Sequence, residues 1–184
     1  MSDVRFPAIP REKMTAEQTA LYDRIATGPR AGVRGPYNAL LRNPELCSLS
    51  ERIGEYVRYR NSLPNALKEM AILITARHWT AQYEWYAHRR IGEQEGLDKA
   101  LCDALARGER PAMDADQAIV FDFTTQMLKK NEVDDATYAR MKDRFGERGV
   151  LDLIYLVGHY CTVAFILNID RHPLPADATP LPAL

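Results

Sequence analysis

The chain has 184 residues, a length that fits one domain, and a formal net charge of −1. Hydrophobic residues make up 46% and charged residues 27%, so the chain can fold around a core of its own. The basic residues are scattered among acidic ones and form no phosphate-tracking stripe. We therefore expect neither nucleic acid nor a membrane surface as a partner.

Three cysteines, Cys47, Cys102 and Cys161, lie far apart and form no Cys-x-x-Cys pair. Their odd number and wide spacing argue against a disulfide framework and a structural zinc site, and they favour a reducing compartment. The first residues are polar, include Pro7, and lack the apolar stretch of a signal peptide. The sequence thus predicts a cytoplasmic protein without a bound metal.

The first predicted helix follows Thr15, which can cap it, and stops before the Gly-Pro pair at residues 28 and 29. Residues 28–36 are too rich in Gly and Pro for regular structure and form a long loop. Arg30 and Arg34 in this loop suit an anionic ligand, because loops on rigid scaffolds often carry binding residues. A plain surface connection is the alternative interpretation.

Every later segment between Gly and Pro residues also has helical spacing of its apolar residues. Alternating strand patterns are missing, so we predict an all-α, single-domain bundle over residues 1–184. Its core spans about residues 40–170, and residues 171–184 form a Pro-rich tail. The later helices are expected to begin at or near Pro44, Pro64, Thr80, Leu97, Asp114, Asp134 and Gly149. Thr80 can cap one of them, Asp134 or Asp135 can cap another, and Gly146 is expected to stop the helix that begins at Asp134.

Residues 150–169 are long and apolar enough to suggest a membrane span. They also carry Asp152, His159 and Asn168, and no second such stretch exists. A helix that is apolar nearly all round is usually central in a soluble bundle, so we predict a buried core helix.

The candidate chemistry lies between residues 69 and 88. Glu84 and His88 are four residues apart, so they share one face of a helix. Glu69 lies on the preceding helix, and a tight turn at residues 79–80 can bring it toward that face. A histidine beside carboxylates in a partly dry pocket is a capable general acid. A Glu–His pair at this spacing is also common on surface helices, where it stabilises by only about 0.2–0.5 kcal/mol.

Residues 69–77 (Glu-Met-Ala-Ile-Leu-Ile-Thr-Ala-Arg) and 83–88 (Tyr-Glu-Trp-Tyr-Ala-His) resemble the signature of the carboxymuconolactone decarboxylase and alkylhydroperoxidase D superfamily. The flanks resemble the larger stand-alone members at residues 28–41, residues 144–149 and the closing helix to Asn168. The resemblance covers nearly the whole chain. It implies a helical bundle of the alkylhydroperoxidase D-like type with about eight helices. It also implies homo-trimers or hexamers with active sites near subunit interfaces.

The superfamily has two chemistries. In its peroxidase branch a Cys-x-x-Cys pair works with a Glu and a His. The resemblance matches that Glu and His to Glu69 and His88, but it matches the two cysteines to Ala81 and Glu84. Without sulfur at these positions, that mechanism cannot run here. The decarboxylase branch has Glu-x-x-x-His instead, which the stretch from Glu84 to His88 fits.

The resemblance implies loss of carbon dioxide from a small carboxylated lactone, or from a related product of aromatic breakdown, with no cofactor. His88 would donate a proton, Glu84 would orient the His88 ring, and Glu69 would act as a second acid/base or a positioning group. The predicted substrate-binding residues are Arg34 as the carboxylate clamp, Arg77 as a weaker candidate for that clamp, and Tyr83 and His159.

Three functions remain open at this point. The first is the lyase or a related acid/base enzyme. The second is a thiol peroxidase that uses a displaced cysteine. The third is a non-catalytic helical oligomer or binding protein that has kept the fold.

Overall fold

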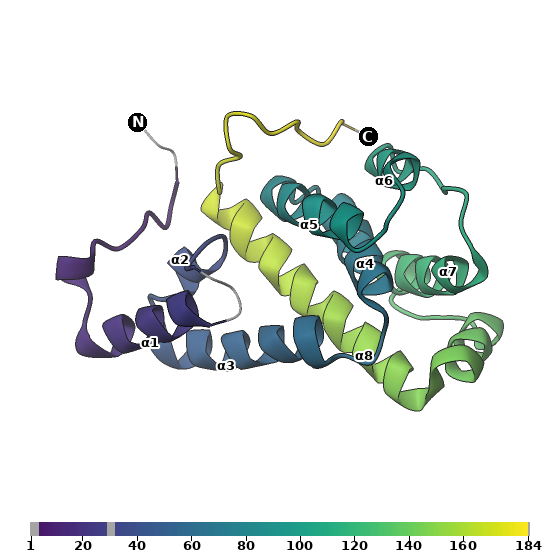
Figure 1. The fold of residues 1–184 in the computed structure, drawn as a ribbon, viewed down its shortest axis with the longest axis horizontal. Helices are drawn as coiled ribbons and strands as arrows, with labels where there is room; N and C mark the ends of the chain where they lie inside the picture. Colours follow the sequence, from purple (N-terminus) through teal and green to yellow (C-terminus); the bar gives the residue numbers. More distant parts are fainter. Residues whose placement is uncertain (1–3, 29–31, 184) are drawn as a thin grey trace.

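The computed structural model describes residues 4–28 and 32–183, and within those residues all regular structure is helical (Figure 1). A 3-10 turn, Arg11–Lys13, precedes the first α-helix, and a π-helical turn, η2 (Tyr56–Arg60), follows α3 directly. This confirms the predicted all-α class. The α-helices are α1 (Ala16–Thr27), α2 (Tyr37–Leu40), α3 (Pro44–Glu55), α4 (Asn65–His78), α5 (Gln82–Gln94), α6 (Lys99–Ala106), α7 (Ala115–Lys130) and α8 (Asp135–Asp170).

Polar caps explain where most of these helices begin. The Thr15 side chain accepts a hydrogen bond from the Gln18 backbone and completes a capping box, as the side chain of Asp114 also does for α7. The prediction that Thr80 caps α5 is wrong. Thr80 has a left-handed φ of 49°, Ala81 is the N-cap residue, and the Thr80 hydroxyl accepts a hydrogen bond from Arg77.

Helix α8 consists of two helical segments that meet in a bend at Gly146, where the backbone is not helical: φ is 68° and ψ is 175°. Two helices were predicted here with Gly146 as the stop, and the bend separates them at that residue. Within the described residues, α8 is also long and apolar enough to cross a membrane, yet half of its most apolar window is buried inside the molecule. Because it packs against α4, α5 and α7, α8 has the arrangement of a core helix in a soluble bundle.

Helix α8 runs through the middle of the molecule, with α1–α3 on one side and α4–α7 on the other (Figure 1). Residues 67–77 of α4 are all buried, since α4 contacts α5, α6, α7 and α8. A second cluster of buried residues, which includes Leu21, Ile25 and Leu41, joins α1 to the segment around α2. The two clusters leave room between them for the cavity described below.

The C-terminal tail continues the core beyond its predicted boundary at about residue 170. The Leu181 side chain is only 6% exposed and belongs to the main buried cluster. Its backbone is held at both polar groups: the Leu181 amide donates to Gln82 Oε1 at 2.8 Å, and Gln82 Nε2 donates to the Leu181 carbonyl at 3.4 Å. Arg77 adds a hydrogen bond to the Pro182 carbonyl at 2.7 Å.

Candidate functional site

Helices α4 and α5 approach each other closely at Gly92, one helical turn after His88. A Cβ atom on Gly92 would lie 2.8 Å from Leu97 Cδ1 and 3.4 Å from Glu69 Cβ. The short distance is to the end of the Leu97 side chain, whereas the distance to Glu69 is an ordinary van der Waals contact between the two helices. Sequence spacing predicted that these two helices could bring Glu69 toward His88, and the structure does bring them into contact.

His88 Nδ1 lies 2.6 Å from Glu69 Oε2, and both side chains are less than 10% exposed. A carboxylate oxygen can only accept, so Nδ1 carries the shared proton and donates it. Nε2 is then the ring nitrogen left for a ligand in the cavity that His88 lines. The His88 ring is further held edge-on against Tyr160, with ring centroids 4.9 Å apart.

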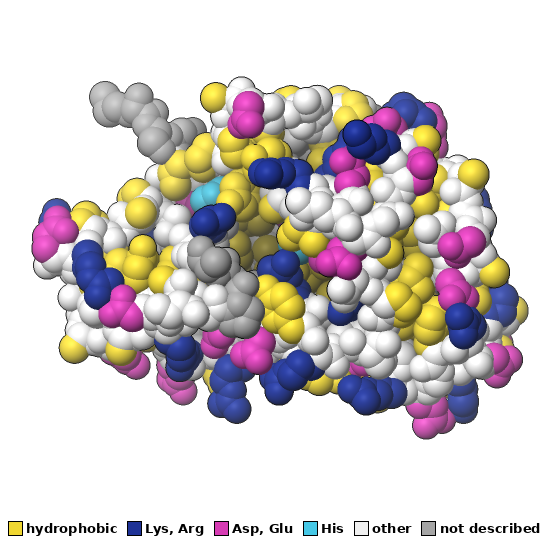
Figure 2. All heavy atoms as spheres, in the orientation of Figure 1, with side chains coloured by type: hydrophobic (Ala, Val, Ile, Leu, Met, Phe, Trp, Pro, Cys, Tyr) yellow, Lys and Arg dark blue, Asp and Glu magenta, His cyan; other side chains and the backbone are white. Residues whose placement is uncertain are grey.

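The cavity beside His88 has a volume of about 540 Å³ and is bounded by α5, η2, α8 and the loop before α2. No Asp or Glu lines it within the described part of the chain, so its electrostatic character is positive. Basic side chains gather around a hollow on the face of the molecule seen in Figure 2. The polar and aromatic wall of the His88 cavity is formed by Arg34, Arg58, Arg90, His88, His159, Gln94, Tyr37, Tyr59, Tyr83, Tyr86 and Tyr160.

Three of the predicted substrate-binding residues, Arg34, Tyr83 and His159, line this cavity together with His88. They come from three separate segments: the loop before α2, helix α5 and helix α8. The Tyr83 ring also packs edge-on against His172 of the tail, with centroids 4.4 Å apart. The structure thus assembles these residues around one hollow, although it leaves their roles as predictions. Arg30, the other loop arginine, lies outside the described residues.

Glu84 does not orient His88, and this part of the prediction is wrong. The Nδ1 atom of His88 is taken by Glu69, and neither carboxylate oxygen of Glu84 has a hydrogen-bond partner among the described residues. Glu84 is 2% exposed and lies near Cys161 of α8, so its carboxyl group is buried in the core. Residues four apart share a helix face, but the packing of each side chain decides whether the two heads meet.

Burial raises the pKa of Glu84 well above its ordinary value. A carboxyl group whose pKa is higher in the folded state than in the unfolded chain binds more protons when folded. The free energy of unfolding therefore falls as pH rises from the unfolded pKa, about 4.3, through the folded pKa. We expect Glu84→Gln to lose less stability than the wild type between pH 5 and pH 8, as measured by urea unfolding.

Glu93→Gln is the matched control for this prediction, because Glu93 lies on the same helix but is partly exposed and paired with Arg89. Its unfolding free energy should follow the wild-type pH profile. If Glu84→Gln also followed the wild-type profile, the Glu84 carboxyl would not titrate differently in the two states.

Arg77 lies outside the His88 cavity, so its assignment as a carboxylate clamp there is wrong. Its guanidinium donates to the Ala106 carbonyl at 3.3 Å and to the Pro182 carbonyl at 2.7 Å. These bonds turn the side chain toward α6 and the tail. Arg77 therefore fastens the tail to the bundle rather than facing His88.

Sequence reasoning did not find Arg58, which lines the cavity and interacts electrostatically with Tyr160 and Glu69. It lies on the π-helical turn η2, where its guanidinium sits 5.1 Å from the centre of the Tyr59 ring. Short π-helical segments often occur at functional sites. The run Tyr-Val-Arg-Tyr-Arg at η2 was the available signal, because arginine among tyrosines suits a planar anion.

None of the three cysteines is placed for peroxide chemistry beside His88. None lines the cavity, and burial raises the pKa of the Cys47 and Cys102 thiols to about 11 each. Burial also raises the pKa of Cys161, which accepts a hydrogen bond from Trp79. Since the thiolate is the nucleophile, all three groups are poor nucleophiles at neutral pH.

No family model matches this chain, and no curated protein matches it either. Among solved structures it is similar to an uncharacterized peroxidase-related protein from Silicibacter sp. TM1040. The TM-score is 0.77 at 17% sequence identity, and the match covers 96% of each chain. At this identity the likeness establishes the fold alone: the two chains share one all-helical arrangement over nearly their whole length.

Proposed function

We propose that this protein is an acid–base enzyme that acts on a small carboxylated ring compound, with lyase chemistry of the decarboxylase kind. One observation carries the proposal: a buried His88–Glu69 pair leaves one ring nitrogen facing a positively charged, tyrosine-rich cavity. A site of this kind holds an anion and offers it a proton at one defined position.

Arginine holds a carboxylate through two parallel hydrogen bonds, and Arg58 and Arg34 supply this clamp at the cavity wall. Tyrosine rings such as Tyr83 and Tyr59 flank the substrate ring. When the bond between the ring carbon and the carboxylate breaks, carbon dioxide leaves and the electron pair passes into the conjugated carbonyl. The carbon then takes a proton from His88 Nε2, and solvent returns a proton to the imidazole. The net reaction exchanges a carboxylate for hydrogen.

A panel of lactone carboxylates assayed for carbon dioxide release tests the proposed reaction. Enzyme-dependent release from at least one member is the expected result. Equal release with and without the enzyme across the whole panel would reject this substrate class.

Arg58→Met should raise KM for the active substrate about 10- to 100-fold, because a hydrogen bond to a charged group contributes roughly 1.5–3 kcal/mol. We expect kcat to change less than KM, because the variant leaves His88 in place. Arg60→Met is the control, as Arg60 lies on the same turn with 60% of its side chain exposed and outside this cavity. Equal KM values for the two variants would remove Arg58 from the clamp.

A thiol peroxidase is the second candidate function, and it is favoured by the similarity in fold to a protein described as peroxidase-related. The high thiol pKa values weigh against it. We expect the Cys47→Ser, Cys102→Ser, Cys161→Ser triple variant to keep its decarboxylase turnover within about two-fold, provided circular dichroism shows it folded. A wild-type peroxide-reducing turnover that disappears in this variant would instead support the peroxidase.

We also propose that the chain associates with copies of itself, as trimers or hexamers, and that it works in the cytoplasm. Large apolar side chains are exposed along α3 and along the outer face of α8: Leu46, Leu49, Ile53, Leu151, Ile154 and Tyr155. A non-catalytic oligomer with this surface is the third candidate function. Light scattering at micromolar concentration should give at least a trimer, and a monomer would contradict the proposed assembly.

A further inference from the structure

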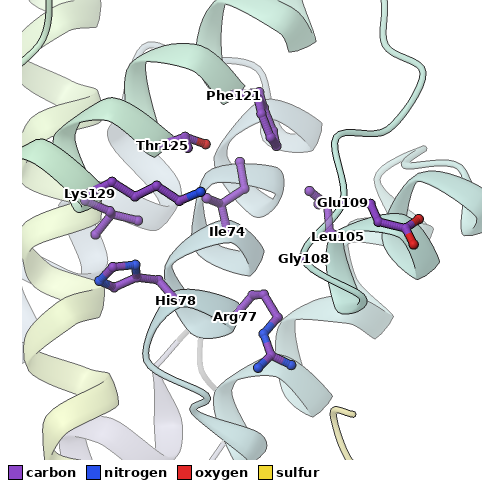
Figure 3. A pocket seen from close by; sticks show the side chains of 10 residues that line it. Ile74, Arg77, His78, Leu105, Gly108, Glu109, Phe121, Thr125 and Lys129 are labelled. Carbon is purple, nitrogen blue, oxygen red and sulfur yellow. The ribbon is translucent and has the colours of Figure 1, made fainter. Parts of the chain in front are cut away.

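A second cavity lies on another face of α4, where α4 meets α6 and α7 (Figure 3). Its volume is about 180 Å³, and it shares no lining residue with the His88 cavity. Nothing in the proposed reaction uses it. Its lining nevertheless has an apolar part and a polar part, and together they indicate which chemical class of ligand would fit.

The apolar part is built by Ile74, Leu105, Phe121 and Leu128. An apolar cavity of about 150 Å³ in a protein core accommodates benzene. A volume of about 180 Å³ is therefore enough for one six-membered ring with a small substituent. The Phe121 ring offers an edge or face against which such a ring can pack.

One polar part, formed by Thr125, Lys129 and His78, lies on the side of the cavity opposite Phe121 and Leu105 (Figure 3). Two further charged residues, Arg77 and Glu109, also line the cavity. Thr125 and Lys129 are four residues apart on α7, so they present their side chains on the same face. The Thr125 hydroxyl is buried and has no hydrogen-bond partner among the described residues. A buried polar atom without a partner is costly, and a ligand atom placed beside it would remove that cost.

The charge at this polar end is that of Lys129. Burial, and then the charge of Lys129, lower the pKa of His78 below its ordinary value, so His78 is neutral at pH 7. Glu109 on the rim is already paired with Arg107 at 2.7 Å. Within the described part of the chain, no carboxylate pairs with Lys129 itself. Lys129 therefore faces the cavity without a counter-ion, whereas the other cation of the lining, Arg77, is held by the Ala106 and Pro182 carbonyls.

We propose that this second cavity binds a single-ring aromatic monocarboxylate. The ring lies among Ile74, Leu105 and Phe121, and the carboxylate accepts hydrogen bonds from the Thr125 hydroxyl and the Lys129 ammonium group. The neutral His78 ring closes the same side and can donate a further hydrogen bond. This binding site is separate from the proposed catalytic site, and the proposal for it does not depend on the proposed reaction.

Titration of ¹⁵N-labelled protein with benzoate tests the proposal. Amide signals of Thr125, Lys129 and Ile74 should shift in a saturable way, and the signals of Tyr83 and His88 report the other cavity separately. Lys129→Gln should weaken benzoate binding at the α7 signals about five-fold, as expected for loss of one exposed charge contact of about 1 kcal/mol. Lys130 is an exposed neighbour outside the cavity, so Lys130→Gln should leave benzoate binding unchanged.

Thr125→Val gives a second, independent variant. Valine has the shape of threonine without the hydroxyl, and because that hydroxyl lacks a partner, the variant should fold with unchanged stability. It should weaken benzoate binding about three- to ten-fold. Three results would overturn the proposal: shifts confined to the His88 cavity, equal affinities for Lys129→Gln and Lys130→Gln, or toluene bound as tightly as benzoate.

Discussion

Replacing His88 with alanine should lower kcat for carbon dioxide release about 100- to 10,000-fold, the usual contribution of a positioned general acid. His88 is the ionisable side chain whose ring nitrogen faces the cavity while its other nitrogen is fixed by Glu69 at 2.6 Å. Removing the imidazole takes away the proton donor but leaves the arginine clamp. The loss should therefore appear in kcat, with KM changed much less.

Glu69→Gln tests the contribution of the second residue of the His88–Glu69 pair. The amide is the same size, but its nitrogen can donate to His88 Nδ1 and so favour the wrong ring tautomer. We expect kcat to fall by about 100-fold, a loss typical for an outer partner of a functional histidine. His78→Ala, a histidine outside this cavity, is the control and should retain wild-type turnover. Full turnover in a folded His88→Ala protein would exclude His88 as the acid.

Asp152→Ala should destabilise the fold by about 3 kcal/mol, the cost of removing a buried charged acceptor that three hydrogen-bond donors share. The Asp152 carboxylate accepts hydrogen bonds from Tyr56 Oη at 2.8 Å, from the Ser62 amide at 2.8 Å and from Ser62 Oγ at 2.7 Å. It thereby fastens the segment from η2 to α4 onto α8. Urea unfolding monitored by circular dichroism measures the loss.

Asp116→Ala is the matched control, because Asp116 also makes two short hydrogen bonds, to Arg144, but at the surface. Solvent screening should limit its effect to less than about 1 kcal/mol. Equal losses of unfolding free energy in the two variants would show that burial does not increase the contribution of Asp152 to stability.

The contribution of Asp152 to folding stability depends on pH in a defined direction. Burial alone would raise the pKa of Asp152, but hydrogen bonds from Ser62 and Tyr56 outweigh burial and lower it below its ordinary value. The stabilisation is therefore complete above the unfolded pKa, about 3.9, and is lost as pH falls through the folded pKa. Asp152→Asn should make the acid limb of the stability curve shallower.

Local chemistry made the helices predictable from sequence. Thr15, Asp114 and Asp134 each cap a helix as expected, and Gly146 interrupts α8 where it was predicted to stop a helix. Three elements were missed: the 3-10 turn at Arg11–Lys13, the four-residue α2, and η2, whose π-helical geometry departs from the 3.6-residue period. Sequence periodicity has no signal for any of them.

The site was only partly predictable, because side-chain direction depends on tertiary packing. The contact between Glu69 and His88 followed from two consecutive helices joined by a short turn. Spacing could not reveal that Glu84 turns into the core, nor that Arg77 reaches the tail. Arg58 was missed because its position follows from η2, which sequence reasoning did not anticipate.

Gly92 has no chemistry of its own, yet it lies where α5 contacts the base of the Glu69 side chain. A methyl group there would lie at ordinary contact distance from Glu69, and only the end of the Leu97 side chain would have to move. Side chains larger than alanine at position 92 would press on Glu69 and shift the carboxylate that holds His88. Such variants would change the orientation of the His88 ring without altering any ionisable group.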